Sequence, residues 1–229
     1  PSVQDVISAM HLAPVAPVFI RKPNFKKFKK NAESDDNWRR ELLADLKATI
    51  RNKDDPDYEA VIGLETHIQL NTKTKIFCSC KADSWLDPQN SNICPVCTGM
   101  PGVLPVLNEK VVEKGVLLAK AMNSEISAES FFDRKNYFYP DLPKGFQISQ
   151  YDRPLAKGGY LDIPMPEGYT RHVSVWKLHL EEDAGKTKNE LGRRLIDFNR
   201  CGVPLVEMVT GPDIRTADEA AQYLIRLRQ

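Results

Sequence analysis

After Asp57 the sequence is dominated by short alternating segments bounded by glycine and proline, and this pattern most constrains the fold. In residues 61–70 one face holds Ile62, Leu64, Ile68 and Leu70 with Thr66, whereas Glu65, His67 and Gln69 fall on the other. Four further strands are expected, at residues 160–163, 172–180, 195–198 and 203–209. Because strands outnumber helices and are not spaced as repeated βαβ units, we expect an α+β domain with a mixed or antiparallel sheet.

Two helices are predicted among these strands. Asn108 is placed to cap a helix that extends to Met122, where a single apolar stripe ends. Thr216 and Glu219 form a capping-box pattern at the start of a second helix. No glycine or proline stops this second helix before Gln229, so we expect the chain to be a piece of a longer protein.

The chain divides into a leader, residues 1–57, and a core, residues 58–229. The leader is predicted to be mostly disordered, with one amphipathic helix over residues 37–50. Its first 31 residues contain six basic residues and one acid, which fits either the remnant of an organellar targeting segment or a solvated linker. The 229 residues hold 32 basic and 31 acidic side chains, so bulk charge does not draw the chain to nucleic acid. No run approaches the roughly 20 apolar residues of a membrane helix.

Four of the five cysteines form two short-spaced pairs with thirteen residues between them, Cys78 with Cys80 and Cys94 with Cys97. Such pairs can each supply two thiolates to a tetrahedral zinc ion, so a small structural zinc knuckle is expected. An iron–sulfur cluster and plain reduced thiols are the alternatives. Four thiolates would leave zinc no open position for a substrate. Cys201 is more typical of a packed thiol than of a nucleophile.

Acidic and imidazole side chains share the polar faces of several predicted strands. Glu65 and His67 lie two apart on the first strand, and His179 and Glu181 repeat that spacing on a later one. Carboxylates with one or two imidazoles suit a hard divalent cation and its phosphate ligands, but a network of ion pairs would show the same pattern. The remaining carboxylates considered for this site are Glu182, Asp183, Asp197 and Glu207.

The segment 131–151 mixes aromatic residues with the cations Arg134, Lys135 and Lys144. Cations beside aromatic rings can hold a phosphate and stack a base. A packed irregular loop anchored by buried tyrosines is the other interpretation.

Five runs of sequence together resemble one known family, the B subunit of the aspartyl/glutamyl-tRNA amidotransferase (GatB). They occur in unbroken order, at residues 58–70, 94–106, 132–150, 179–186 and 196–207. The resemblance implies a cradle-like α+β domain similar to the glutamine synthetase catalytic core. It also implies an ATP- and Mg²⁺-dependent ligase that phosphorylates the glutamate of Glu-tRNA(Gln). Glutamine-derived ammonia then gives Gln-tRNA(Gln), with the amidase (A) and small (C) subunits of the amidotransferase complex as partners.

On this resemblance the magnesium ligands are expected to be Glu65, His67, Glu181 and Glu182. Asp183, Asp197 and Glu207 are expected to add coordination or to position water, and Arg134, Lys135 and Lys186 to contact phosphate. The resemblance also strengthens the assignment of the four paired cysteines to zinc. An organellar location, chloroplast or mitochondrion, is expected from the basic leader and the form of the first motif. The competing functions are a zinc-knuckle binding module without chemistry and an inactive assembly scaffold.

Overall fold

The computed structural model describes residues 59–229 of the chain. The predicted leader and its helix over residues 37–50 lie outside this range. The described residues form two helices and ten strands. The pairs β1–β10, β2–β5, β3–β4, β5–β7 and β8–β9 are all antiparallel. The α+β class is therefore confirmed. None of the described helices is long and apolar enough to cross a membrane.

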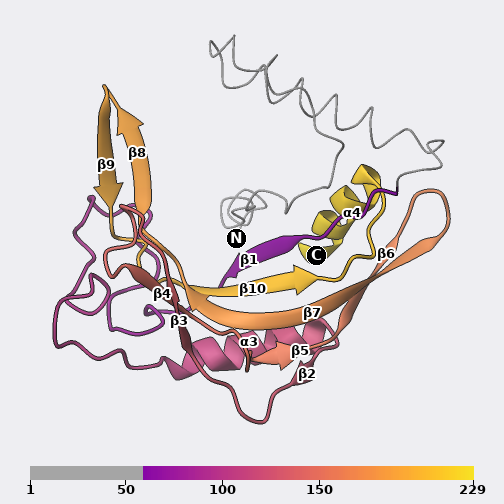
Figure 1. Cartoon of the computed structure of the whole chain (residues 1–229), viewed down its shortest axis with the longest axis horizontal. Coiled ribbons are helices and arrows are strands. Elements are labelled where there is room, and N and C mark those ends of the chain that lie inside the picture. The colour runs from indigo at the N-terminus through magenta and orange to yellow at the C-terminus, as the bar shows by residue number, and fades with distance from the viewer. Residues whose placement is uncertain (1–58) are drawn as a thin grey trace. The chain divides into compact units, whose positions relative to one another are not determined.

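The main sheet has six strands, with the hydrogen-bonded order β1-β10-β7-β5-β2 and β6 paired to β7 (Figure 1). The strands of the ordered path are β1 (Glu65–Gln69), β10 (Pro204–Thr210), β7 (Thr170–Glu182), β5 (Ala156–Lys157) and β2 (Glu125–Ile126). β6 is Tyr160–Pro164. The predicted strands at 160–163, 172–180 and 203–209 are therefore confirmed, because their alternation or apolar content matches a sheet with buried faces.

By compactness the chain divides into two units, and β7 and β10 contribute residues to both. Among the described residues, the larger unit contains Glu65–Tyr160 and Val175–Val209. Its core is built from fully buried side chains of β7, β10 and α3 (Glu109–Ala121), among them Leu178, Val206 and Val111. Gly115 brings α3 close to the sheet, since a Cβ there would lie 2.6 Å from Leu155 and 2.9 Å from Leu180.

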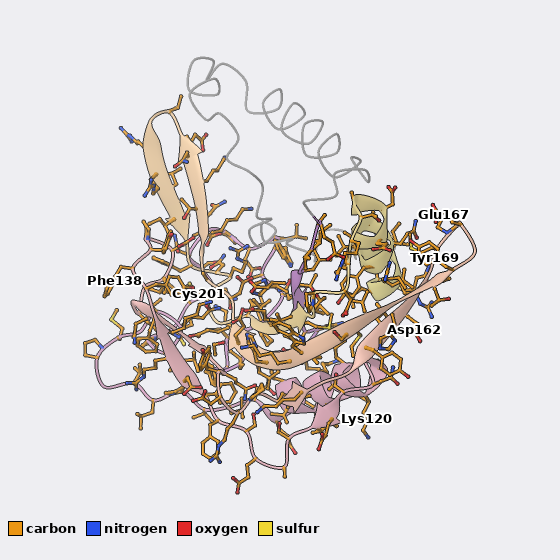
Figure 2. The ribbon with its side chains drawn as sticks, turned by 45° about the vertical axis from the view of Figure 1, so that its right-hand side comes forward. Lys120, Phe138, Asp162, Glu167, Tyr169 and Cys201 are labelled. Carbon is orange, nitrogen blue, oxygen red and sulfur yellow. The ribbon has the colours of Figure 1, made fainter. Side chains whose placement is uncertain are left out.

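The predicted start is confirmed at both helices, and so is the predicted end of α3, whereas α4 ends at Leu227, before Gln229. The side chain of Asn108 accepts a hydrogen bond from the N–H of Lys110, and α3 ends where Asn123 adopts a φ of 56°. In the smaller unit, α4 (Ala217–Leu227) begins with a complete capping box between Thr216 and Glu219. The side chain of Glu219 is also the acceptor for Tyr169 Oη at 2.9 Å and Arg171 Nε at 2.8 Å. Figure 2 labels Tyr169 beside Glu167 at the turn between β6 and β7.

Two strand pairs lie outside the main sheet. β3 (Asp133–Asn136) pairs with β4 (Phe146–Ser149), and β8 (Lys186–Glu190) pairs with β9 (Arg193–Asp197). The second pair forms a hairpin that projects beyond the sheet in Figure 1. The strand expected at 195–198 is β9, but β8 and β3 were not predicted because all of their residues are exposed and carry no apolar alternation.

The first predicted strand is shorter than expected. Only Glu65–Gln69 pairs as a strand, and Ile62 forms an isolated bridge with Ile214. The N–H of Leu64 bonds to the side chain of Thr210 at 2.9 Å instead of to a backbone carbonyl, which ends the regular ladder there. The predicted faces are confirmed over residues 62–66, where Ile62, Leu64 and Thr66 are buried, whereas Ile68 is half-buried like His67 and Gln69.

Candidate functional site

Three neighbouring strands bring one imidazole and two carboxylates together. His67 on β1 lies directly opposite Glu207 on β10, and β10 is hydrogen-bonded to β7, which carries Glu181. The Nε2 atom of His67 is 2.8 Å from Oε1 of Glu181 and 3.4 Å from Oε2 of Glu207. One ligand atom from each residue lies within 4.8 Å of the other two, so we call His67, Glu181 and Glu207 the acid–histidine cluster.

Both carboxylates of the cluster are buried, so each needs a compensating positive charge. The hydrogen bond with Glu181, followed by that with Glu207, raises the pKa of His67 from 6.5 to about 10. The imidazole therefore carries a proton at neutral pH and is the counter-charge of the two acids. Oxygen and imidazole ligands at this separation fit a hard divalent cation, which would take over that role.

His179 supports the cluster from β7. Its Nε2 atom is 3.1 Å from Oε2 of Glu207 and 3.8 Å from Oε2 of Glu181. Burial alone would raise the pKa of Glu207, but hydrogen bonds from His179 and His67 outweigh burial and hold that pKa below its usual value. Sequence alternation places His179 on the same face as Glu181 but gives it no role. Its contact with Glu207 depends on a strand distant in sequence.

The expected magnesium ligands are only partly gathered here. His67 and Glu181 lie together as expected. Glu207, which was expected only to add coordination or to position water, is the third member of the cluster. Glu65 is exposed and lies opposite Val209. Glu182 follows Glu181 on the strand and has different partners, because successive side chains of a strand point to opposite faces.

Glu182 is buried in a contact with Lys144 and accepts a hydrogen bond from the N–H of Ile148 at 2.8 Å. Burial raises the pKa of Glu182, against the opposing effect of Lys144. Both residues line a cavity of about 380 Å³ in the larger unit. Apolar side chains form most of its wall, together with Arg134, whose guanidinium lies 5.1 Å from the ring centre of Phe146.

The other expected site residues have contacts of their own. Asp183 lies 3.4 Å from Arg200, and burial, which outweighs the effect of Arg200, raises the pKa of Asp183 to about 6. Asp197 accepts hydrogen bonds from the backbone N–H groups of Asn90 and Asn199, so it fixes a loop. Lys135 and Lys186 are exposed on β3 and β8.

The segment 131–151 is not a packed loop anchored by buried tyrosines. It contains the β3–β4 pair, and its tyrosines are half-buried or exposed, as Tyr139 and Tyr151 are at 65% and 71% exposure. That interpretation was wrong because the segment's order comes from strand pairing and from cation–ring contacts such as that of Lys135 with Tyr137, at 5.9 Å.

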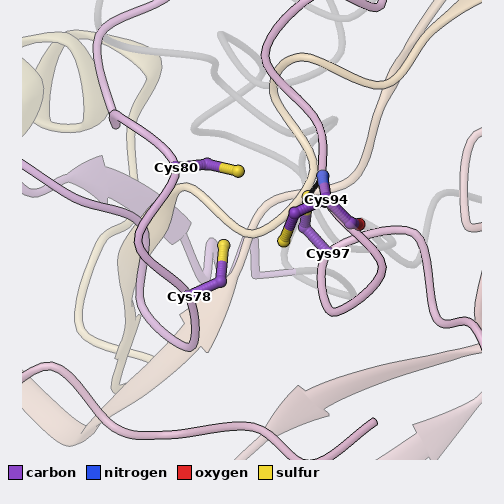
Figure 3. A group of neighbouring side chains, drawn as sticks. All are labelled: Cys78, Cys80, Cys94 and Cys97. Carbon is purple, nitrogen blue, oxygen red and sulfur yellow. Dashed lines mark hydrogen bonds between the residues drawn. The ribbon is translucent and has the colours of Figure 1, made fainter.

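The four paired cysteines form a second cluster, in which one sulfur from each lies within 4.8 Å of the others. Cys78 and Cys80 come from one loop and Cys94 and Cys97 from another (Figure 3). Tetrahedral zinc with thiolates at about 2.3 Å needs sulfur atoms about 3.8 Å apart, so this arrangement fits zinc. The pKa of Cys97 is lowered to about 4, mainly by a hydrogen bond with Cys78, which outweighs the opposing effect of burial.

The turn after the second pair brings the cysteine cluster close to the cavity. Thr98 Oγ1 donates to the carbonyl of Cys94 at 2.8 Å, and Gly99 adopts a φ of 70°. A Cβ at Gly99 would lie 2.3 Å from the side chain of Lys144, so glycine permits this close approach. Cys78 and Cys97 also line the cavity. The remaining cysteine, Cys201, is a buried free thiol whose pKa burial raises to about 12, as expected for a packed thiol.

The fold and the two clusters define a class of protein, an α+β domain with an acid–histidine centre and a separate four-cysteine centre. Comparison with known proteins identifies the family, because residues 60–229 match the GatB/GatE catalytic domain. The chain belongs to this family.

Curated relatives agree with this assignment. The chain is 54% identical over 177 residues to the B subunit of the aspartyl/glutamyl-tRNA(Asn/Gln) amidotransferase of Carboxydothermus hydrogenoformans, covering 75% of this chain and 36% of that protein. It is 52% identical over 182 residues to the B subunit of the chloroplastic/mitochondrial glutamyl-tRNA(Gln) amidotransferase of Physcomitrium patens, covering 75% of this chain and 32% of that protein. The chain thus spans about a third of the length of these relatives.

Proposed function

We propose that the chain is the catalytic part of the B subunit of a tRNA-dependent amidotransferase, an ATP-dependent carbon–nitrogen ligase acting on Glu-tRNA(Gln). The observation that carries this proposal is the acid–histidine cluster, which three strands assemble within 4.8 Å. The family match and the names of the relatives support the reaction class. The amidase (A) subunit and the small (C) subunit of the complex are the proposed partners.

The reaction has two steps. An oxygen of the glutamate side-chain carboxylate attacks the γ-phosphorus of ATP. A bond forms between this oxygen and the phosphorus, which gives an acyl phosphate, and the bond between the phosphorus and the bridging oxygen of the departing ADP breaks. The nitrogen of ammonia then attacks the acyl carbon, phosphate leaves with its electron pair, and the nitrogen loses a proton. The first step is needed because a carboxylate has no good leaving group.

His67, Glu181 and Glu207 are the proposed holders of Mg²⁺, which when bound neutralises charge on the transferring phosphoryl group. Glu65 and Glu182 stay predicted ligands on the resemblance alone, since neither belongs to the acid–histidine cluster. Asp183 and Asp197 remain predicted to position water or to add coordination. His179 holds the carboxylate of Glu207 in place. Arg134, Lys135 and Lys186 are the proposed phosphate contacts. Cys78, Cys80, Cys94 and Cys97 would hold a structural zinc ion.

The test is the variant Glu181→Gln in the assembled enzyme. It keeps the size of the side chain but removes a charge from the cluster, so ATP turnover that depends on Mg²⁺ and Glu-tRNA(Gln) should fall about 10²–10³-fold. Glutamine hydrolysis by the amidase partner should persist. The matched control is Glu129→Gln, because Glu129 is exposed and pairs only with exposed Arg153 at 3.0 Å among the contacts of the described chain. Full ATP turnover in Glu181→Gln would contradict the proposal.

A second candidate function is assembly through the knuckle. Leu104 and Val106, which follow the second cysteine pair, are 80% and 75% exposed. Exposed apolar side chains of this kind favour a protein partner over nucleic acid. Replacing both with serine should weaken capture of the amidase partner while leaving zinc content unchanged; unaltered capture would reject this function.

We also propose an organellar location. The basic leader and the chloroplastic/mitochondrial name of the Physcomitrium patens relative support it, whereas other relatives are bacterial.

A further inference from the structure

One lysine is buried completely beside the cysteine cluster. Lys75 has a relative exposure of 0%, and its backbone N–H donates to the carbonyl of Cys80 at 2.9 Å. Its Nζ atom donates to the carbonyl of Asn92 at 2.9 Å and lies 3.6 Å from the sulfur of Cys97. The backbone of Lys75 therefore contacts the loop of the first cysteine pair, and its side chain contacts the loop of the second.

Burying an ammonium group is strongly unfavourable unless an anion compensates it. Within residues 59–229, no carboxylate lies within 4.0 Å of the Nζ atom of Lys75. The hydrogen-bond partners of Nζ are one carbonyl oxygen and one sulfur. The anion that this lysine faces is therefore supplied by the cysteines themselves.

The charge of a four-thiolate zinc centre provides the required anion. Four thiolates and one Zn²⁺ sum to a net charge of −2, and N–H···S hydrogen bonds to such thiolates tune how tightly the metal is held. Cys97 Sγ also receives the backbone N–H of Cys94 at 3.2 Å, so two donors converge on one sulfur. Because two donors bond to this buried sulfur, we expect Cys97 to bind the metal as a thiolate whose negative charge these donors stabilise.

We propose that Lys75 is the counter-ion of the zinc centre: its ammonium group donates to the Cys97 thiolate and joins the two cysteine loops. Lys75 is a positioning residue, because it acts on the metal through a ligand and through the carbonyl of Asn92. This role rests on the zinc assignment made under the proposed function.

Lys81 gives a matched comparison. It lies in the same loop, directly after Cys80, and pairs with Asp87 at 2.7 Å, with 56% of its side chain exposed. A change of Lys81 to methionine removes the same charge and adds the same side chain, but at a site where water screens the charge.

The experiment measures the zinc affinity of the whole 229-residue chain by competition with a chromophoric chelator. Lys75→Met should bind zinc about 10–100-fold more weakly than the wild type, the range found when an outer partner of a metal ligand is lost. Lys81→Met should stay close to the wild type. Equal affinities of Lys75→Met and the wild type would overturn the proposal.

A second measurement separates metal binding from folding. If Lys75 acts on the zinc centre, the rise in melting temperature caused by zinc should be smaller in Lys75→Met than in the wild type. If both proteins gain the same rise, Lys75 merely packs the loop and the proposal fails. A wild-type chain that binds no zinc after reconstitution would overturn the zinc site and this role together. Because zinc is measured without amide synthesis, a failure of the proposed reaction would be a separate result.

Discussion

Replacing His67 with glutamine should destabilise the chain in a way that depends on pH, when a chelator keeps divalent cations away. The pKa of His67 rises from 6.5 to about 10 because its imidazole bonds first to Glu181 and then to Glu207. At about 1.4 kcal/mol per pH unit, a change of this size sets a ceiling of about 5 kcal/mol. The His67 side chain keeps 24% of its exposure, so solvent screening lowers the expected contribution to about 2 kcal/mol.

The sign follows from proton linkage. The folded chain binds the proton of His67 more tightly than the unfolded chain does, because the folded pKa is higher. The stabilisation is therefore fully present below pH of about 6.5 and is lost as the pH rises through about 10. Over this window the stability of the wild type should fall towards that of His67→Gln, since the proton is released in both the folded and the unfolded states at the upper end.

The assay is urea unfolding followed by far-ultraviolet circular dichroism at pH 6, 8 and 10, with the wild type and His67→Gln compared at each pH. The control is His172→Gln. His172 pairs with Asp162 at 2.7 Å, but both side chains are more than half exposed, at 62% and 52%, so its loss should change little. A difference between the wild type and His67→Gln that stays constant from pH 6 to pH 10 would refute the reasoning.

Two further predictions concern the framework around the site. Glu219→Ala should lower the free energy of unfolding by about 2–3 kcal/mol in urea unfolding, because its buried carboxylate accepts hydrogen bonds from Arg171 and Tyr169. The exposed turn variant Glu167→Ala should change it by less than about 0.5 kcal/mol, and equal effects would contradict the prediction. Gly159→Ala should lower the melting temperature more than Gly158→Ala. Both glycines have positive φ, but only at Gly159 would a Cβ meet atoms within 4 Å, including the carbonyl of Met122 at 2.5 Å. An equal drop in melting temperature in both variants would mean that backbone strain at positive φ, and not the close contact at Gly159, sets the loss, which would contradict the prediction.

Sequence reasoning located five of the ten described strands and both described helices because their signals are local. The apolar alternation of β7 and the capping residues Asn108 and Thr216 each depend on neighbours within a few positions. The β8 strand carries no such signal, since it is exposed on both faces and is defined only by its pairing with β9. Register between distant segments is likewise not encoded in either segment alone.

The same limit explains the outcome at the site. Alternation alone puts His67 and Glu181 each on the polar face of a strand, but it cannot say which carboxylate of a third strand will stand opposite His67. The register between β1 and β10 decides this, and it selects Glu207. Glu65 shares the face of His67 but lies opposite Val209, where it remains exposed.

The adjacent residues Glu181 and Glu182 show how one strand can serve two centres. Because side chains alternate along β7, one carboxylate enters the acid–histidine cluster and the next meets Lys144 at the cavity wall. The cysteine cluster lies on the Glu182 side, since Cys78 and Cys97 line that cavity and Gly99 packs against Lys144. Loss of the cysteine geometry should therefore disturb the contact between Lys144 and Glu182 first. It should reach His67 less directly, through the backbones of β7 and β10, because the N–H of Ile76 beside the first cysteine pair donates to the carbonyl of Gly202 just before β10. A structural role for the cysteine cluster is thus compatible with chemistry at the acid–histidine cluster.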